Sequence, residues 1–151
     1  MTLEMDAEVI FSHADAADLG FIRQLLVDNK LPTQDLITTP IDFIVAEQDG
    51  QIIGCIGLER YSSDGFVRSF AVSVHWRNKG IGRALSGRLE AYALSNSIHT
   101  MHLLTTTAQD YFGKQGFVLT DRASAPESIL NTTEFKGMCT SSAVYMVKKI
   151  V

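Results

Sequence analysis

The chain has 151 residues, of which 46% are hydrophobic and 20% charged, and this composition is typical of one globular domain with its own core. Its 13 Lys and Arg residues against 17 Asp and Glu residues give a net charge of −4, which argues against non-specific nucleic-acid binding as the main function. The N-terminal sequence lacks a basic stretch followed by an apolar core, and no apolar run approaches the roughly 18 residues of a membrane-spanning helix. We therefore expect a cytoplasmic protein with no membrane segment, in which any anion site is local.

The cysteines and histidines do not predict a metal site. Cys55 and Cys139 are far apart in the sequence and form no C-x-x-C motif, so neither a zinc ribbon nor a redox pair is indicated. Free buried thiols in a reducing compartment are the simpler expectation. His99 and His102 form an H-x-x-H pattern, but an extended segment directs these two side chains to opposite faces.

The N-terminal quarter predicts a strand followed by a helix. Val9–Phe11 is a short apolar run, and Asp15 is a suitable N-cap residue for the helix that follows. The helix ends before Pro32, and a short helical turn is predicted around Thr33–Ile37. Apolar residues recur at helical spacing at Leu19, Ile22, Leu25 and Leu26.

Three β-rich runs follow. Ile41–Glu47 and Gln51–Leu58 are joined through Asp49-Gly50, which is a strong signal for a tight hairpin. A second turn at residues 62–65 leads into the run Phe66–Val74. The region therefore predicts three consecutive neighbouring strands.

The second half of the chain alternates helices and strands. Thr107–Asp110 resembles a capping box that opens a short helix ending before Gly116. The order predicts an α/β (α+β) fold in a single domain, residues 1–151, with a mixed sheet and helices on both faces. The remaining predicted elements are a helix whose apolar stripe is Ile81, Leu85, Leu89 and Tyr92, and the strands Ile98–Thr106, Phe117–Leu119 and Ala143–Ile150.

A glycine-rich loop, HWRNKGIGRAL, lies between the third β-run and the central helix. It contains R-x-x-G-x-G, formed by Arg77, Gly80 and Gly82. The first N–H groups of a helix have no internal partners and carry the positive end of the helix dipole, and glycines let a ligand approach the backbone. Arg77, Lys79 and Arg83 add mobile positive charge. The loop therefore suits an anion such as a pyrophosphate.

Other interpretations of this loop are weaker or remain open. A P-loop requires G-K-[ST], which is missing, and Leu85 stands where a dinucleotide fingerprint has its third glycine. For the loop alone, a glycine-rich turn with solvated cations is the alternative.

With Phe70–Val74 before the loop and Tyr111–Phe117 (YFGKQGF) downstream, the chain resembles the GNAT superfamily of acetyl-CoA-dependent N-acetyltransferases. The resemblance covers nearly the whole chain in element order. It implies a mostly antiparallel sheet splayed at its central strands, with Ile98–Thr106 as the splayed partner, and acetyl-CoA as co-substrate. It implies coenzyme contacts through the backbone of Phe70, Ala71, Val72 and Val74 and, for the pyrophosphate, through Arg77, Asn78, Lys79, Gly80, Ile81, Gly82 and Arg83.

A closer resemblance rests on three segments: Val67–Val72, Leu103–Ala108 and Glu134–Val144. They are similar to N-acetyltransferases associated with arsenic-resistance operons, and the L-T-T-x-A type of segment is also similar to amino-acid N-acetyltransferases that act on glutamate. Thr140 departs from the first group, in which proline is expected after the cysteine. Both resemblances imply a small amine that carries a carboxylate.

The reaction needs a base for the ammonium and a proton for the leaving thiolate. Glu59, at the end of a strand and across the turn from Arg68, is the candidate base, perhaps through water; a solvated strand-end charge is the alternative. Tyr111 is the candidate acid, although Phe112 occupies the position at which many GNAT enzymes have tyrosine, and a packing role is the alternative.

Arg68 is the candidate substrate residue because a guanidinium pairs with a carboxylate through two prongs. Strand alternation would place it on the face of Phe70, where an unpaired charge is costly. A structural pair with Glu59 or Asp64 is the alternative. Ser69 and Ser142 complete the predicted substrate set. Ser141 and Ser142 could add hydroxyl groups beside the last strand, and a role as turn residues is the alternative for these two.

These features predict an acyltransferase that moves acetyl from acetyl-CoA by direct transfer to the primary amine of a small carboxylate-bearing substrate. An amino acid or an analogue, including an arsenic-containing one, fits this description. The alternatives are a protein or peptide N-acetyltransferase and a non-catalytic acetyl-CoA-binding module, the latter suggested by Phe112. Neither nucleic acid nor membrane is an expected partner, and a homodimer is left open.

Overall fold

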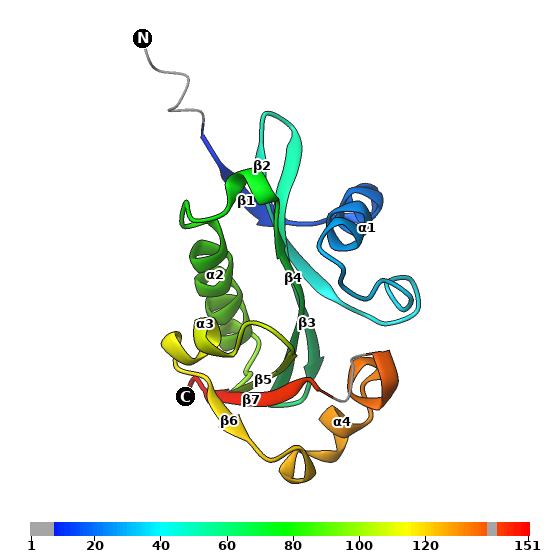
Figure 1. The fold of residues 1–151 in the computed structure, drawn as a ribbon, viewed down its shortest axis with the longest axis vertical. Helices are drawn as coiled ribbons and strands as arrows, with labels where there is room; N and C mark the ends of the chain where they lie inside the picture. Colours follow the sequence, from blue (N-terminus) through cyan, green and yellow to red (C-terminus); the bar gives the residue numbers. More distant parts are fainter. Residues whose placement is uncertain (1–7, 139–141) are drawn as a thin grey trace. The chain divides into compact units, whose positions relative to one another are not determined.

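The computed structural model describes residues 8–138 and 142–151 (Figure 1). In this part of the chain seven strands form a sheet in the order β1-β2-β3-β4-β5-β7-β6. The β4–β5 pairing is parallel, whereas β1–β2, β5–β7 and β6–β7 are antiparallel. The predicted mixed, mostly antiparallel sheet is therefore confirmed. The strands are β1 (Ile10–His13), β2 (Asp42–Gln48), β3 (Gln51–Tyr61), β4 (Asp64–Val72), β5 (Thr100–Thr105), β6 (Val118–Thr120) and β7 (Val144–Lys149).

The chain divides into two compact units. The first unit contains Met1–Gly57 and Ser69–Leu89, and the second contains Leu58–Arg68 and Glu90–Val151. Strands β3 and β4 contribute residues to both units. The single-domain assignment stays a prediction. No helix within residues 8–138 and 142–151 combines the length and the apolar character needed to cross a membrane.

In the first unit, a short 3-10 turn (Ala16–Asp18) leads into helix α1 (Leu19–Asp28). Asp15 caps the turn: its Oδ1 accepts from Ala17 N (3.0 Å), and its own N–H donates to Asp18 Oδ2 (2.9 Å). This reciprocal arrangement satisfies N–H groups that lack helical partners, and it confirms Asp15 as the predicted capping residue.

The core of the first unit lies between α1 and strands β2, β3 and β4. Helix α1 contributes three side chains at helical spacing because its apolar residues follow the predicted stripe. The buried side chains of this core are Ile22, Leu25, Leu26, Leu36, Phe43, Val45, Cys55 and Ala71.

The turn between β2 and β3 has the predicted two-residue geometry. Asp49 (φ 53°) and Gly50 (φ 78°) both adopt left-handed backbone conformations. Such a turn matches the twist of the two strands that it joins, and Asp-Gly tolerates it well. The predicted hairpin is confirmed.

Helix α2 (Ile81–Ser95) packs closely on strand β3 within the first unit. A Cβ built on Gly54 would lie 3.0 Å from Leu85 Cδ1 and 3.2 Å from Ile81 Cγ2. In a dinucleotide-binding fold the third glycine of the fingerprint allows the helix to approach its strand. Here the glycine is in the strand and the large side chain is in the helix, which explains why a leucine is tolerated at that position of the loop motif.

In the second unit, α3 (Gln109–Lys114) connects β5 to β6. The predicted capping box at residues 107–110 is wrong. The helix begins one residue later than the box requires, with Ala108 as N-cap and no side-chain cap, and Thr105 Oγ1 accepts from Ala108 N (3.0 Å). Gly116 adopts φ 98° just after the helix, as expected for a residue that ends it.

The segment between β6 and β7 contains helical turns that were not predicted. They are a 3-10 turn (Arg122–Ser124), helix α4 (Glu127–Leu130) and a π-helical segment (Glu134–Met138). The core of the second unit includes residues from this segment and from β4 and β7, namely Phe66, Ala125, Ile129 and Tyr145.

Candidate functional site

The predicted coenzyme strand has an irregular backbone. Ser69, inside β4, has φ 54°, and its carbonyl accepts from Cys55 Sγ (3.3 Å). A left-handed residue in a strand acts as a bulge and interrupts the alternation of side chains. The alternation that was used to place Arg68 on the face of Phe70 is therefore wrong across this position.

The strand is also shorter than predicted. It ends at Val72, and Ser73 N donates to Ile53 O (2.8 Å). Val74 begins a 3-10 turn (Val74–Trp76) and its side chain is 63% exposed. The predicted strand through Val74 is thus wrong by two residues, because the chain must turn before the loop. The pantetheine contacts of Phe70 to Val74 stay predictions.

The R-x-x-G-x-G loop places backbone amides at the N-terminus of α2. Asn78 (φ 63°) and Gly80 (φ 85°) are left-handed, and the first helical bond is Ala84 N to Gly80 O (3.1 Å). Left-handed residues between ordinary ones turn successive N–H groups toward a common side, which favours an anion. Ile81 is buried and anchors the helix start, whereas Lys79 is exposed. The local geometry therefore suits the predicted pyrophosphate, and the contacts of the individual loop residues stay predictions.

Arg77 is held differently from the expectation. Its Nη2 donates to Asn29 Oδ1 (2.5 Å), and its Nε donates to Val72 O (3.2 Å). In the structure its guanidinium is bound to two groups of the first unit, and the predicted contact of Arg77 with phosphate stays a prediction.

In the second unit, Arg68 lies in a buried charged cluster with two glutamates. Arg68 Nη1 is 2.8 Å from Glu59 Oε2, and Arg68 Nη2 is 3.2 Å from Glu134 Oε2. Tyr61 OH also donates to Glu59. Arg68 is 3% exposed and Glu59 is 1% exposed. We call Glu59, Tyr61, Arg68 and Glu134 the arginine cluster.

The cluster decides between some of the predicted alternatives. Glu59 is not a solvated strand-end charge, because it is buried and paired. Of the two structural partners considered for Arg68, Glu59 is confirmed, whereas Asp64 pairs with His102. The catalytic role of Glu59 and the substrate role of Arg68 stay predictions.

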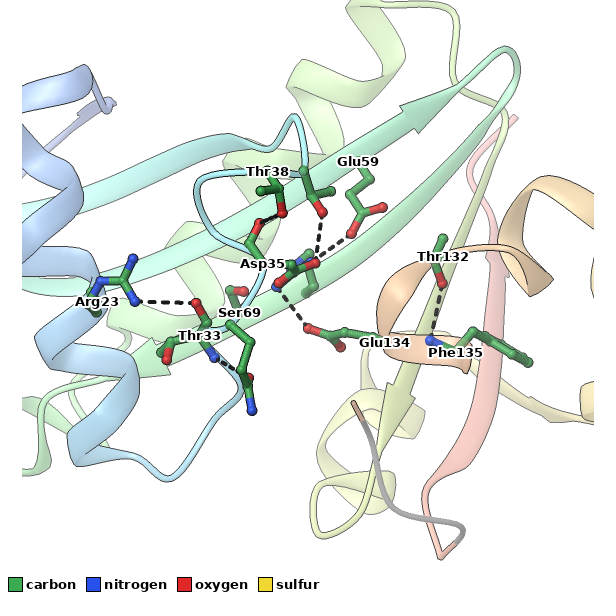
Figure 2. Close-up of polar contacts among 12 residues, drawn as sticks. Arg23, Thr33, Asp35, Thr38, Glu59, Ser69, Thr132, Glu134 and Phe135 are labelled. Carbon is green, nitrogen blue, oxygen red and sulfur yellow. Dashed lines mark hydrogen bonds and ion pairs between the residues drawn. The ribbon is translucent and has the colours of Figure 1, made fainter. Parts of the chain in front are cut away.

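Glu134 had no sequence signal as a partner of Arg68. Figure 2 shows it on the same turn as Thr132 and Phe135. Thr132 Oγ1 donates to Ile129 O (2.9 Å) and accepts from Phe135 N (3.3 Å), which fixes the backbone on both sides of Glu134. A partner 66 positions away in the chain is visible only after folding.

The sequence analysis also did not predict a second buried hydrogen-bond network, formed by Asp64, His102 and Tyr145. His102 Nε2 is 2.8 Å from Asp64 Oδ1, and His102 Nδ1 is 2.6 Å from Tyr145 OH. Burial, with a smaller contribution from the charge of Asp64, raises the pKa of Tyr145 to about 12. Tyr145 therefore stays protonated at neutral pH, and its O–H donates to Nδ1 in the tautomer of His102 that carries its proton on Nε2, facing Asp64.

His102 is buried in β5 and His99, which precedes the strand, is exposed. Among the described residues, no group of three or more His, Cys, Asp or Glu side chains is arranged to hold a metal ion.

Tyr111, the candidate acid, lies on α3 and is 39% exposed. Its ring packs edge-on against Phe112, with ring centroids 5.3 Å apart, and Phe112 is buried against Phe117. This packing agrees with the alternative reading of Tyr111, while its role as proton donor stays a prediction. Ser142 is exposed, and Ser69 is buried.

Cys55 is a free buried thiol, as predicted. Burial raises its pKa to about 12, although a backbone hydrogen bond at Ala71 acts in the opposite direction. Such a thiol is not nucleophilic at neutral pH. Cys139, Thr140 and Ser141 lie outside the described residues.

Comparison of the sequence with known proteins identifies relatives among acetyltransferases. The family described as "Acetyltransferase (GNAT) domain" matches residues 39–119. An uncharacterized N-acetyltransferase of Chlorobaculum tepidum is 32% identical over 101 residues, which are 66% of this chain and 64% of that protein. An amino-acid acetyltransferase of Aliivibrio fischeri (strain MJ11) is 31% identical over 86 residues, or 56% of this chain and 19% of that protein. The chain thus spans less than two thirds of the length of either relative.

Solved structures show the same fold. N-acetylglutamate synthase from Neisseria gonorrhoeae, complexed with coenzyme A and N-acetyl-glutamate, matches 96% of this chain and 36% of its own, with a TM-score of 0.79 and 21% identity. A GNAT-family acetyltransferase from Staphylococcus aureus Mu50 matches 95% of this chain and 100% of its own, with a TM-score of 0.77 and 16% identity. The family match covers more than half of the chain. The chain therefore belongs to the acetyltransferase (GNAT) domain family, as the sequence resemblance predicted.

Proposed function

We propose that the chain is an acyltransferase that moves acetyl from acetyl-CoA to the primary amine of a small carboxylate-bearing molecule. The observation that carries this proposal is the loop before α2, where Asn78 and Gly80 adopt left-handed conformations and the helix N-terminus follows. Backbone amides of this kind bind phosphate groups without a metal ion. Membership in the GNAT family supports acetyl-CoA as the phosphate-bearing co-substrate.

The proposed transfer is direct. The neutral amine attacks the thioester carbonyl, the C–S bond breaks, and the thiolate leaves and takes up a proton. By the family resemblance, a backbone N–H near Phe70 and Ala71 stabilises the carbonyl oxygen. Glu59 is our candidate for removing the proton from the ammonium through water, and Tyr111 is our candidate for protonating the thiolate. An acetyl-cysteine intermediate at Cys55 is not expected, because its thiol is buried and has a raised pKa.

A carboxylate-bearing substrate is supported by two findings. The relatives include proteins named amino-acid acetyltransferase, and a buried arginine, Arg68, lies in β4 two positions before the first predicted coenzyme contact, Phe70. Glu59 and Glu134 hold two nitrogens of the Arg68 guanidinium. A guanidinium held in one orientation has already lost the rotamer freedom that substrate binding would otherwise cost.

Free thiol released from acetyl-CoA measures the proposed activity. The substrate panel contains amino acids, arsenic-containing amino-acid analogues, amines without a carboxylate and basic peptides. We expect turnover with the carboxylated amines. Turnover with peptides alone would instead identify a peptide N-acetyltransferase, and tight acetyl-CoA binding without any turnover would identify a non-catalytic binding module.

The role of Arg68 is tested separately with Arg68→Lys, which keeps the charge and removes the fork. Wild type and variant are each assayed with a carboxylated amine and with its amide, in a double cycle. If Arg68 contacts the substrate carboxylate, the variant loses roughly ten- to a hundredfold in kcat/KM with the carboxylated amine and far less with the amide. Arg60→Lys, an exposed change in the neighbouring strand β3, is the matched control. Additive losses would show that Arg68 does not contact the carboxylate.

A further inference from the structure

Arg77 connects the R-x-x-G-x-G loop before α2, residues 77–82, to the C-terminal end of helix α1. We call this loop the coenzyme loop. One edge of the Arg77 guanidinium makes both contacts: Nε donates to Val72 O (3.2 Å) and Nη2 donates to Asn29 Oδ1 (2.5 Å). The Nε and Nη2 pair is one of the edges with which arginine grips an anion through two parallel hydrogen bonds. In Arg77 that edge is bound to the protein itself.

Asn29 is well placed to hold this contact. It is the C-cap residue of α1, its N–H reaches Leu26 O (3.1 Å), and its Nδ2 donates to Leu25 O (2.8 Å). Because Nδ2 is a donor and bonds a carbonyl, Oδ1 is the atom left to accept from Arg77. Lys30 then adopts φ 60°, which ends the helix. Asn29 is therefore oriented by the helix end before it meets Arg77.

The same helix end leads into the turn around residues 33–39. Arg23, on α1, donates from Nη1 to Thr33 O (3.4 Å), and Leu36 is buried in the core that contains Leu25 and Leu26. The loop, the end of α1 and the following turn thus form one continuous set of contacts within the first unit.

We propose that Arg77 is a positioning residue, which fixes the entry of the coenzyme loop to the end of α1, and that it does not grip phosphate. Asn29 is its partner in this role. Coenzyme binding at the loop then also stabilises the end of α1, because the two segments share the Arg77 contacts. This inference rests on the proposed function, since it assumes that the loop binds acetyl-CoA.

The test is a double cycle with Arg77→Lys, Asn29→Ala and the double variant, in which the dissociation constant of acetyl-CoA is measured by calorimetry. Asn29 lies on the helix and outside the loop motif, so a phosphate role for Arg77 predicts no effect of Asn29→Ala. We expect each single variant to raise the dissociation constant of acetyl-CoA by about three- to tenfold. The dissociation constant of the double variant should not exceed that of the more affected single variant. Gln24→Ala, an exposed change on α1 that removes the bond to Asp28, is the matched control and should bind as wild type does.

Salt dependence supplies a second readout. A lost phosphate contact reduces the salt dependence of binding, because less opposite charge is being screened. We expect the slope of log Kd against log salt to stay that of wild type in Asn29→Ala and Arg77→Lys, and to fall in Lys79→Ala. Hydrogen exchange of the wild type should show that coenzyme A protects residues 25–31, and Asn29→Ala should lose this protection.

The outcomes are distinct. Wild-type affinity in Asn29→Ala, additive losses in the double variant, or no protection of residues 25–31 in the wild type would each overturn the positioning role. Failure of the wild type to bind acetyl-CoA at all would instead overturn the proposed function.

Discussion

Arg68→Met should strongly destabilise the protein, because it removes the positive charge from the arginine cluster. Glu59 and Glu134 are then left buried without the guanidinium that lies 2.8 and 3.2 Å from their carboxylate oxygens. Removing one partner of a buried ion pair costs about 3–5 kcal/mol. For a chain of this length that loss corresponds to a fall in Tm of about 6–20 °C. Urea and thermal unfolding at pH 7 measure it directly.

The pH dependence separates lost charge from lost packing. In the variant, burial without a cation raises the pKa of the two carboxyl groups above their unfolded values. A group whose pKa is raised in the folded state stabilises the fold at pH values below its unfolded pKa, and this stabilisation is lost as the pH rises through the folded pKa. The loss of unfolding free energy in the variant, relative to wild type, should therefore be smaller at pH 5 than at pH 7. The triple variant Arg68→Met, Glu59→Gln, Glu134→Gln should recover much of the loss at pH 7, because the two glutamates of the arginine cluster then no longer carry buried charges.

Arg60→Met is the matched control for this experiment. Arg60 is in the neighbouring strand β3 and its Nη1 donates to Asn96 Oδ1 (3.2 Å), but its side chain is exposed. We expect a change within about 0.5 kcal/mol. A loss below about 1 kcal/mol in Arg68→Met, or an equal loss at pH 5 and pH 7, would refute the electrostatic account of the cluster.

Three further results are expected. Gly82→Glu adds bulk and negative charge at the start of α2, so acetyl-CoA binding should collapse in calorimetry while circular dichroism stays native; unchanged affinity would contradict the assignment of the loop. Tyr145→Phe should cost about 1–3 kcal/mol in unfolding free energy, because the buried Nδ1 of His102 loses its donor. Its deficit should shrink between about pH 10 and 12, where wild type loses the stability that the raised tyrosine pKa provides; a constant deficit would argue against the hydrogen bond. Cys55→Ala should retain turnover after allowance for stability, and native Cys55 should resist thiol reagents at pH 8, since its pKa is about 12; rapid labelling of the folded protein would contradict its burial.

Elements whose signals are local were predicted well from the sequence. Asp49-Gly50 gave the hairpin, Asp15 gave the cap before α1, and the stripe from Ile81 to Leu89 gave the buried face of α2. In each case the residues that determine the conformation lie within a few positions of one another. The loop motif belongs to the same class, because its glycines and the helix start are contiguous.

Features that depend on distant partners were missed or misplaced. Ser69 has a left-handed backbone although it is not a glycine, so the sequence did not indicate a bulge there. The prediction therefore continued the alternation of side chains through this position. Glu134 meets Arg68 only because a helical segment outside the predicted elements presents it, and His102 meets Tyr145 only because β5 pairs with β7. The candidate coenzyme loop was thus predictable from a short stretch of sequence, whereas the arginine cluster required the fold.

The contact between Gly54 and Leu85 constrains how the coenzyme loop can evolve. With 3.0 Å between the Cδ1 of Leu85 and the position of a Cβ at residue 54, the two sites share one fixed volume. A homologue with alanine or a larger residue at position 54 should therefore carry a smaller residue at position 85, and the glycine of a dinucleotide fingerprint would be one such solution. The two positions should covary even though they lie in different elements. A larger residue at position 54 alone would push the first turns of α2 away from β3 and would move the backbone amides of the loop. Such a change would weaken coenzyme binding although residue 54 lies outside the loop.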